Sequence, residues 1–461
     1  MSITSKIIRS EFKKAEEAYE FCWDVLITMK TRNMGKGSAV RLMAFQDKLA
    51  TAIFELQRVR DMIILEEKAY VKNKSRYQFE WFKNKLQTLS KYKKAIDRMV
   101  NIAKDLGDAF AHFFYQFEHD LLNEHLSHEV VINHTSGLGE LGELAFVKNI
   151  KHLNKEFPIY HGITNILRYG DFSFVDLRTL KISRIGELKT KQVDEKKLNG
   201  MLYIIDREKV NQKEAKQRLM EERPKDRRER QILGISKFLS IEDKDPKIDG
   251  TIVNESYAIK IGELIDECPI NGQLSKQLSP GLAFLCFRFK KASLFHKLLN
   301  REIDEVEREL EKMFTTIVTK LVKSEEKRNS LIIGQLLHVD KKFDPCIPGT
   351  IPLFWTNMEN KALKKIYFKD SHLISLFNPV HLILDVEKMG FQVDSKYSHP
   401  PVRTPDKLFA VVQRFDLFIG YIIRHLMTEE FVLDFIREIQ KSPYWGTNAK
   451  ISMKPQQKIF L

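Results

Sequence analysis

Residues 169–191 read YGDFSFVDLRTLKISRIGELKTK, and this stretch decides the fold of the segment around it. Its apolar residues alternate with other residues near 171–177 and again over 181–190, which predicts two β-strands. A hairpin through residues 177–180 would set these strands side by side. The stretch therefore predicts a local sheet, in contrast to the helical periodicity that precedes it.

Charged side chains of both predicted strands can meet on one face of this hairpin. Glu187 and Lys189 stand two residues apart, so they point the same way, while Leu188 packs on the opposite side. The phenylalanines of the first strand alternate likewise, which leaves Asp171 on the face away from them. One carboxylate from each strand can then meet in space, with a lysine adjacent.

Such a cluster needs a counter-charge. Two carboxylates within hydrogen-bonding range repel each other, and one protonates unless a cation lies between them. Mg²⁺ suits two carboxylates that leave room for waters and a phosphate. A metal lowers the pKa of a bound water, while metal and lysine stabilise charge on phosphate oxygens. This is the chemistry that phosphodiester hydrolysis needs.

The segment resembles the PD-(D/E)XK nuclease superfamily, whose pattern is an Asp at the start of one strand and Glu-x-Lys on the next. The order of elements also matches, with a short helix at about 140–153 and a first strand near 159–167 before the hairpin. The resemblance covers about residues 137–192. It implies a restriction-endonuclease-like mixed sheet flanked by helices.

The resemblance also implies roles for single residues. Asp171 and Glu187 would bind the metal, Mg²⁺ or alternatively Mn²⁺, helped by the backbone carbonyl of Leu188. Lys189 would orient or activate the attacking water. Glu143 would reach in from the upstream helix to hold a water or a second metal.

Several of these assignments have alternatives. The interval from Asp171 to the glutamate is somewhat long, and Asp176, at the end of the first strand, is an alternative metal ligand. Asp171 is favoured because a glycine precedes it. Gln192 is a weaker candidate for the accessory glutamine of some relatives. For Glu187 and Lys189 the alternative is a charge pair on an exposed sheet face, and for Glu143 an ordinary helix position.

The charge of the chain favours a polyanionic partner. The net charge is +14, and each Lys or Arg at a phosphate releases a condensed counterion, although a membrane surface or simple solubility explains the same excess. Lysines and aromatic residues mingle over residues 72–98, as on a nucleic-acid surface. A helix with a solvated lysine face is the alternative. The candidate nucleic-acid-binding residues are Lys83, Lys85, Lys91, Lys93 and Lys94.

We expect a multidomain α/β protein, because 461 residues exceed one ordinary core. Residues 1–130 show helical periodicity and would form a domain for dimerisation or target engagement. The nuclease core would span 131–295, with a charged insertion near 206–250. A C-terminal α/β domain would occupy 296–461.

Further elements follow from local pattern. Breaks between helices are expected at residues 33–38, at 73–75 and at Gly107. A charged helix is expected at about 294–327. The remaining expectations are a strand at 281–289, a strand at 331–339, and helices between about 406 and 440.

The sequence gives no sign of export or membrane insertion. The first twenty residues predict an amphipathic helix, and the most apolar late stretch is shorter than a membrane span. Four widely spaced cysteines suit a reducing cytoplasm. His125 and His128 could share a helix face as zinc ligands, but no HExxH motif is present, which favours an ordinary amphipathic helix. We therefore expect a cytoplasmic protein.

The sequence thus predicts a Mg²⁺-dependent nuclease that hydrolyses DNA phosphodiester bonds. By analogy of build, it would serve prokaryotic restriction or anti-phage defence, as a homodimer or with a partner protein of a defence system. The alternative is a non-catalytic nucleic-acid-binding or scaffold protein that retains a nuclease-like fold.

Overall fold

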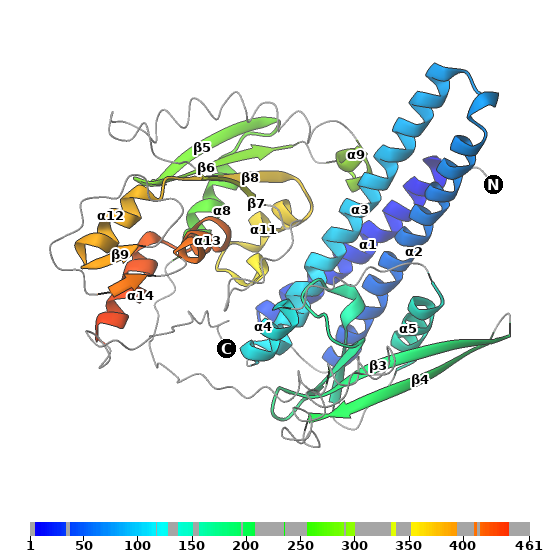
Figure 1. Cartoon of the computed structure of the whole chain (residues 1–461), viewed down its shortest axis with the longest axis horizontal. Coiled ribbons are helices and arrows are strands. Elements are labelled where there is room, and N and C mark those ends of the chain that lie inside the picture. Colours follow the sequence, from blue (N-terminus) through cyan, green and yellow to red (C-terminus); the bar gives the residue numbers. More distant parts are fainter. Residues whose placement is uncertain are drawn as a thin grey trace. The chain divides into compact units, whose positions relative to one another are not determined.

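A computed structural model of the chain forms two compact units (Figure 1). Unit 1 comprises residues 1–245, 293–299 and 340–345, and unit 2 comprises 246–292, 300–339 and 346–461. The structure describes residues 5–33, 37–116, 118–127, 137–150, 156–194, 197–207, 235, 256–289, 292–299, 333–337, 352–393, 410–412 and 415–441.

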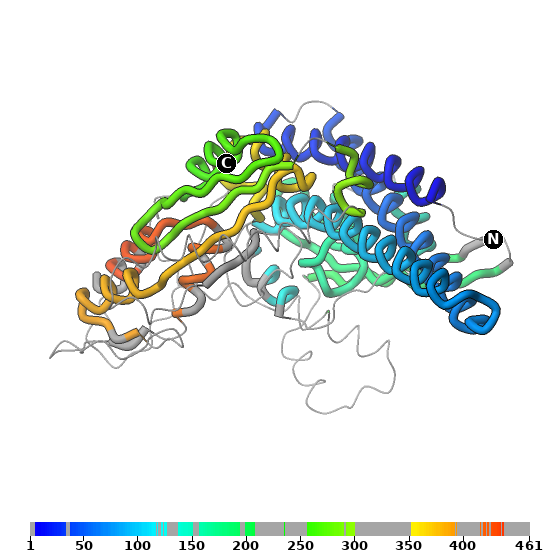
Figure 2. Tube along the Cα trace, turned by 90° about the horizontal axis from the view of Figure 1, so that it is seen from above, coloured from blue at the N-terminus to red at the C-terminus, as the bar shows by residue number. Residues whose placement is uncertain are grey.

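Three long helices of unit 1 lie side by side (Figure 2). Their apolar stripes face one another, as the buried Ile53, Leu56 and Ile63 show. The prediction of helices over residues 1–130 is confirmed for the described part of this range, which ends at Ser127, with breaks near 33–38 and 73–75. Besides α5 and η2, which are described with the sheet below, the helical elements described in unit 1 are α1 (Ser5–Lys30), α2 (Ser38–Lys72), η1 (Lys74–Arg76), α3 (Phe79–Tyr115), α4 (His119–Ser127) and α9 (Leu294–Leu299).

Gly107 does not separate two helices, so that prediction was wrong. It lies inside α3, where a Cβ atom would stand 1.8 Å from the carbonyl oxygen of Ile163. Glycine is needed there because the backbone of α3 touches the 3₁₀ turn η2 (His161–Ile163). Close packing, and not a helix end, explains this residue.

Unit 1 also holds a four-stranded sheet in the order β1-β2-β3-β4. The predicted hairpin is confirmed, with Phe172 opposite Gly186 and Asp176 opposite Lys181. All pairings among these described strands are antiparallel, so the mixed sheet that the resemblance implied is not found among them. The combination of helices and sheets confirms the α/β class at a coarse level. The strands are β1 (Glu156–Tyr160), β2 (Phe172–Asp176), β3 (Lys181–Asp194) and β4 (Lys197–Asp206).

The predicted strand at 159–167 was only partly right. The chain leaves the sheet after Tyr160 and turns through η2, since His161 and Thr164 form a 3₁₀ turn. The charged insertion expected near 206–250 lies almost wholly outside the described residues.

Helices cover this sheet at close range. Helix α5 (Leu138–Asn149) packs on β3, where a Cβ atom at Gly142 would stand 1.9 Å from the Oγ1 atom of Thr190. Helix α2 covers the edge strand β1 through Gln46, whose amide donates to the carbonyl of Pro158 (2.9 Å) and accepts from the backbone N–H of Tyr160 (2.7 Å). These contacts join the helices and the sheet within unit 1.

Unit 2 contains a second antiparallel sheet in the order β5-β6-β8-β7 and a parallel pair β9–β10. The strands predicted at 281–289 and 331–339 are confirmed as β6 and β7, and late helices are confirmed as α13 and α14. The predicted helix at 294–327 is described only over α9. The elements are α8 (Ala258–Glu267), β5 (Gly272–Ser279), β6 (Leu282–Arg288), β7 (Ile333–Leu337), η5 (Leu353–Trp355), α11 (Asn360–Tyr367), β8 (Ser371–Phe377), α12 (Val380–Lys388), β9 (Phe391–Val393), β10 (Ala410–Val412), α13 (Asp416–His425) and α14 (Glu429–Lys441).

None of the helices described in either unit combines the length and the apolar character that crossing a membrane requires.

Candidate active site

Asp171 lies where the chain enters β2, and its carboxylate turns toward β3. Gly170 before it has φ +69°, a conformation that glycine adopts without strain. The Asp171 backbone N–H donates to the carbonyl of Gly186 (2.8 Å), and its Oδ2 atom accepts from the backbone N–H of Leu188 (2.6 Å). The carboxylate thus continues the β2–β3 pairing just before the first residue of β2.

Glu187 and Lys189 share one face of β3, as predicted. The Lys189 Nζ atom lies 2.6 Å from the Glu187 Oε1 atom. The Glu187 side chain is 12% exposed and that of Lys189 is 41% exposed, so the carboxylate is sheltered while the ammonium group reaches solvent. Leu188 between them is buried, as expected for the opposite face.

Glu143 reaches the same region from α5. Its Oε2 atom accepts a hydrogen bond from the hydroxyl of Tyr160 at 2.7 Å. Burial, with the negative charges of Glu140 and Glu187, raises the pKa of Glu143 to about 7, while the Tyr160 hydrogen bond opposes this rise. The helix therefore places a carboxyl group whose pKa lies near neutral pH next to the hairpin.

The surroundings of Asp171 favour its protonated form more strongly than those of Glu143 do. Burial, with the charges of Glu143 and Glu187, raises the pKa of Asp171 to about 8 against the opposing effects of the Leu188 N–H and Lys189. Because these carboxylates act on one another, they share one electrostatic environment. This is the condition that a bound cation relieves.

Asp171 and Glu187 are the side chains that could hold a magnesium ion together with several waters. Among the described residues, no group of three or more His, Cys, Asp or Glu side chains is arranged to hold a metal ion. Mg²⁺ keeps several waters and uses one or two carboxylates, so Asp171 and Glu187 are enough protein side chains. The Leu188 carbonyl could add an oxygen, because a strand residue directs its N–H and C=O to the same neighbouring strand and the N–H of Leu188 faces Asp171.

Two other predicted site residues lie elsewhere. Asp176 stands at the opposite end of β2, at the hairpin turn, where Arg178 binds both its oxygens. These hydrogen bonds lower the pKa of Asp176 to about 2. Gln192 is exposed far along β3, opposite Leu198 of β4. The structure does not bring either side chain to Glu187.

The five candidate lysines of α3 fall into two groups. Lys85 lies 3.0 Å from Glu66, and Lys93 binds Glu67, so these two lysines hold α3 against α2. The other three are exposed, namely Lys83, Lys91 and Lys94.

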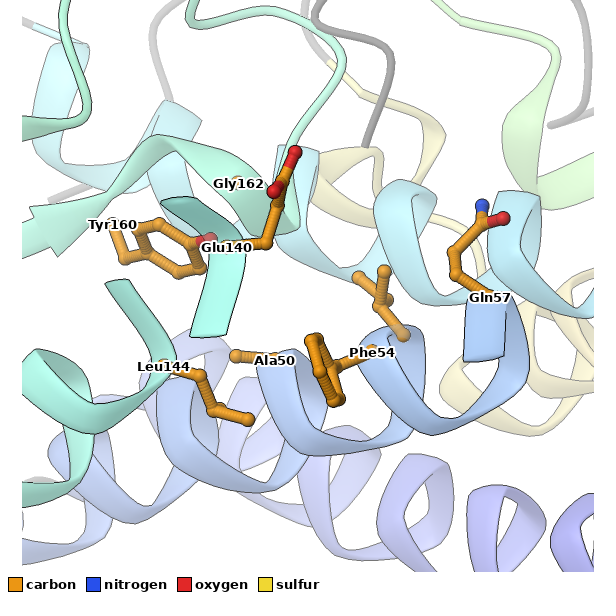
Figure 3. A pocket seen from close by; sticks show the side chains of 8 residues that line it. Ala50, Phe54, Gln57, Glu140, Leu144, Tyr160 and Gly162 are labelled. Carbon is orange, nitrogen blue, oxygen red and sulfur yellow. The ribbon is translucent and has the colours of Figure 1, made fainter. Parts of the chain in front are cut away.

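A pocket adjoins the candidate site (Figure 3). Tyr160 and Glu140 line it, and both also act on Glu143. Tyr160 was not predicted from the sequence, because an aromatic residue in an apolar strand gives no sign that its hydroxyl meets a carboxylate from a helix. The pocket is lined by Ala50, Ile53, Phe54, Gln57, Glu140, Leu144, Tyr160 and Gly162.

A scan against protein-family models and searches of curated proteins and of solved structures give no match to this chain.

Proposed function

We propose that unit 1 is a Mg²⁺-dependent nuclease that hydrolyses phosphodiester bonds of DNA. The observation that carries this proposal is the meeting of two strands around Leu188. Its N–H holds the carboxylate of Asp171, and the Glu187–Lys189 pair flanks it. A structural ion pair alone would not require a second, half-buried carboxylate, with its pKa raised to about 8, at the same place.

The side chains of the site have separable tasks. Asp171 and Glu187 would hold the ion, and a bound Mg²⁺ lowers the pKa of a coordinated water and neutralises charge on phosphate oxygens. Lys189, held by Glu187 and reaching solvent, can orient the attacking water or stabilise a phosphate oxygen.

Glu143 and Tyr160 form the third part of the proposed active site. With a pKa near 7, the carboxyl group of Glu143 can accept or release a proton at neutral pH. Its hydrogen bond from Tyr160 fixes the orientation of that carboxyl group toward the hairpin. The pair therefore supports proton movement at the edge of the site.

The test compares two lysines of one strand. Lys189→Ala removes the ammonium group beside Glu187, and Lys191→Ala removes an exposed lysine two residues farther along β3. With plasmid DNA and Mg²⁺, we expect Lys189→Ala to lower the cleavage rate about 100-fold or more, and Lys191→Ala to leave it near that of the wild type. Glu187→Gln should behave like Lys189→Ala.

Binding separates this proposal from the scaffold alternative. The inactive variants should still bind DNA, since the exposed lysines of α3 are unchanged. If the wild type binds DNA but cleaves none with Mg²⁺ or Mn²⁺, the protein is a binding or scaffold protein instead. If Lys189→Ala and Glu187→Gln cleave as fast as the wild type, the proposed site does not carry the cleavage.

A further inference from the structure

Four buried polar side chains form one continuous chain of hydrogen bonds behind the candidate site. The Tyr115 hydroxyl of α3 lies 3.1 Å from the Nε2 atom of His125 of α4 and 2.6 Å from the Oγ atom of Ser173 of β2. Ser173 Oγ in turn lies 2.6 Å from the Nε2 atom of His161 of η2. All four residues are fully buried, so these contacts are not competing with bulk water.

The backbone at each end fixes the direction of the protons. At one end, the Nδ1 atom of His125 accepts from the backbone N–H groups of Arg168 (2.9 Å) and Tyr169 (3.1 Å), so its proton is on Nε2. At the other end, the Nδ1 atom of His161 faces the carbonyl oxygen of Gly170 at 2.9 Å and must donate to it.

With these two tautomers, one set of donor and acceptor roles satisfies all the hydrogen bonds between the two histidines. His125 donates to Tyr115, Tyr115 donates to Ser173, and Ser173 donates to the bare Nε2 atom of His161. Burial lowers the pKa of His161 to about 4, which keeps its ring neutral as this arrangement requires. We call this chain, from His125 to Gly170, the relay.

Both ends of the relay hold the backbone just before the metal-binding carboxylate. The His161 ring binds the Gly170 carbonyl, and the His161 backbone N–H donates to the Asp171 carbonyl at 2.9 Å. Gly170 has positive φ, so its peptide orientation depends on such contacts. With the backbone fixed, the Asp171 carboxylate meets the N–H of Leu188.

We infer that His125, Tyr115, Ser173 and His161 are positioning residues, whose relay fixes the Gly170–Asp171 peptide so that Asp171 stands ready beside Leu188. This inference rests on the proposed function for its catalytic consequence, but the positioning itself can be measured without any metal or DNA. Zinc binding by His125 is not needed to explain its burial, because both of its ring nitrogens have protein partners.

Two substitutions at His161 separate positioning from a general loss of packing. In His161→Asn the amide nitrogen takes the place of Nδ1 and can still donate to Gly170. In His161→Gln the amide lies near the former Nε2, toward Ser173, and Gly170 loses its donor. Both variants lose the imidazole ring, so a loss of packing is common to both.

Amide hydrogen exchange of the full chain, without metal, is the first readout. We expect the backbone amides of Asp171 and Leu188 to exchange about tenfold faster in His161→Gln than in His161→Asn, as when one ordinary hydrogen bond is lost. Equal exchange in the two variants overturns the inference. If neither variant folds, Ser173→Ala should speed exchange of the same amides. Ser183→Ala, at another hydrogen-bonded serine of this sheet, is the control and should not speed it. Equal exchange in the two serine variants also overturns the inference.

Cleavage with Mg²⁺ is the second readout. We expect His161→Gln to lower kcat about tenfold with little change in KM, and His161→Asn to recover most of the wild-type kcat. An equal loss of kcat in both variants overturns the catalytic consequence of the relay. If exchange differs as expected but the wild type cuts no DNA, the positioning role of the relay is supported and the proposed nuclease function fails.

Discussion

At the scale of single residues, the site is defined by a carboxylate that the fold holds in an unfavourable place. Asp171 is half-buried near two other carboxylates, and a backbone N–H donates a hydrogen bond to it. Without a cation such a group retains a proton at neutral pH, and with a cation it releases that proton. Metal binding and protonation of Asp171 are therefore competing ways to neutralise one site.

This competition predicts a pH-dependent stability difference between the wild type and Asp171→Asn, which imitates the protonated acid. The pKa of Asp171 is about 8 in the folded protein, above its ordinary 3.8, so the folded state binds the extra proton between these values. The stability that this proton contributes is complete below about pH 4 and is lost as the pH rises through about 8.

Thermal unfolding without metal checks this sign. The two proteins should unfold at similar temperatures near about pH 4, and Asp171→Asn should be the more stable near about pH 8.5. Mg²⁺ at the higher pH should raise the unfolding temperature of the wild type more than that of the variant. A difference that stays constant over the whole pH range would contradict the prediction.

Gly170 carries a second prediction at this scale. Its φ of +69° disfavours any side chain, and a Cβ atom would lie 2.5 Å from the Cγ2 atom of Ile185. Gly170→Ala should therefore destabilise the protein by about 1–3 kcal/mol and reduce cleavage. Gly139→Ala is the control, because a Cβ atom there meets nothing within 4 Å and alanine favours the helix. Urea unfolding measures both, and equal stability of the two variants would refute the argument.

At the scale of elements, the edge strand β1 depends on helix α2. Gln46 binds the backbone of Pro158 and of Tyr160, so its amide satisfies backbone groups of the edge strand that a neighbouring strand would otherwise satisfy. Gln46→Met keeps the volume but leaves two buried backbone groups without that partner. We expect a loss of about 2–6 kcal/mol in urea unfolding, since each of the two unsatisfied groups costs about 1–3 kcal/mol.

Gln87→Met serves as the control for this prediction. Gln87 is exposed on α3, where such a substitution should change stability by no more than about 0.5 kcal/mol. If Gln46→Met is as stable as this control, α2 does not support the sheet through Gln46. Because Tyr160 also binds Glu143, a loosened β1 should lower cleavage as well.

The elements that the sequence predicted are those with local signals. The β2–β3 hairpin follows from period-two alternation and a short turn, and it brings Glu187, Lys189 and Asp171 together. The partners of those residues come from distant segments. Tyr160 meets a carboxylate of α5, and His161 joins a relay that starts in α4. No periodicity encodes such meetings, because tertiary packing decides them.

Gly107 shows the same limit within one helix. A glycine in a helical pattern suggests a helix end, but here the neighbouring turn at Ile163 requires it. The prediction of a helix end at this glycine was wrong, and the packing of α3 on η2 is the reason that a glycine is needed there.

At the scale of the whole molecule, every candidate site residue lies in unit 1, and so do the basic residues of α3. Lys85 and Lys93 bind glutamates of α2, whereas the exposed lysines at 83, 91 and 94 fall within about a quarter turn of one helix face. These three lysines form a basic stripe on α3, which we propose contacts the phosphate backbone of DNA.

This stripe predicts how DNA binding depends on salt. A variant with Lys83, Lys91 and Lys94 changed to alanine should bind DNA more weakly, and the slope of log affinity against log salt should fall by up to about 0.9 for each lysine that contacts a phosphate. The control changes three exposed lysines of α1, Lys6, Lys13 and Lys14, and so alters the net charge equally. Fluorescence anisotropy with a labelled duplex, over a series of salt concentrations, measures both slopes. If the two triple variants lose the same slope, net charge alone attracts DNA, whereas a loss confined to the α3 variant identifies this face of the helix as the surface that contacts the phosphates.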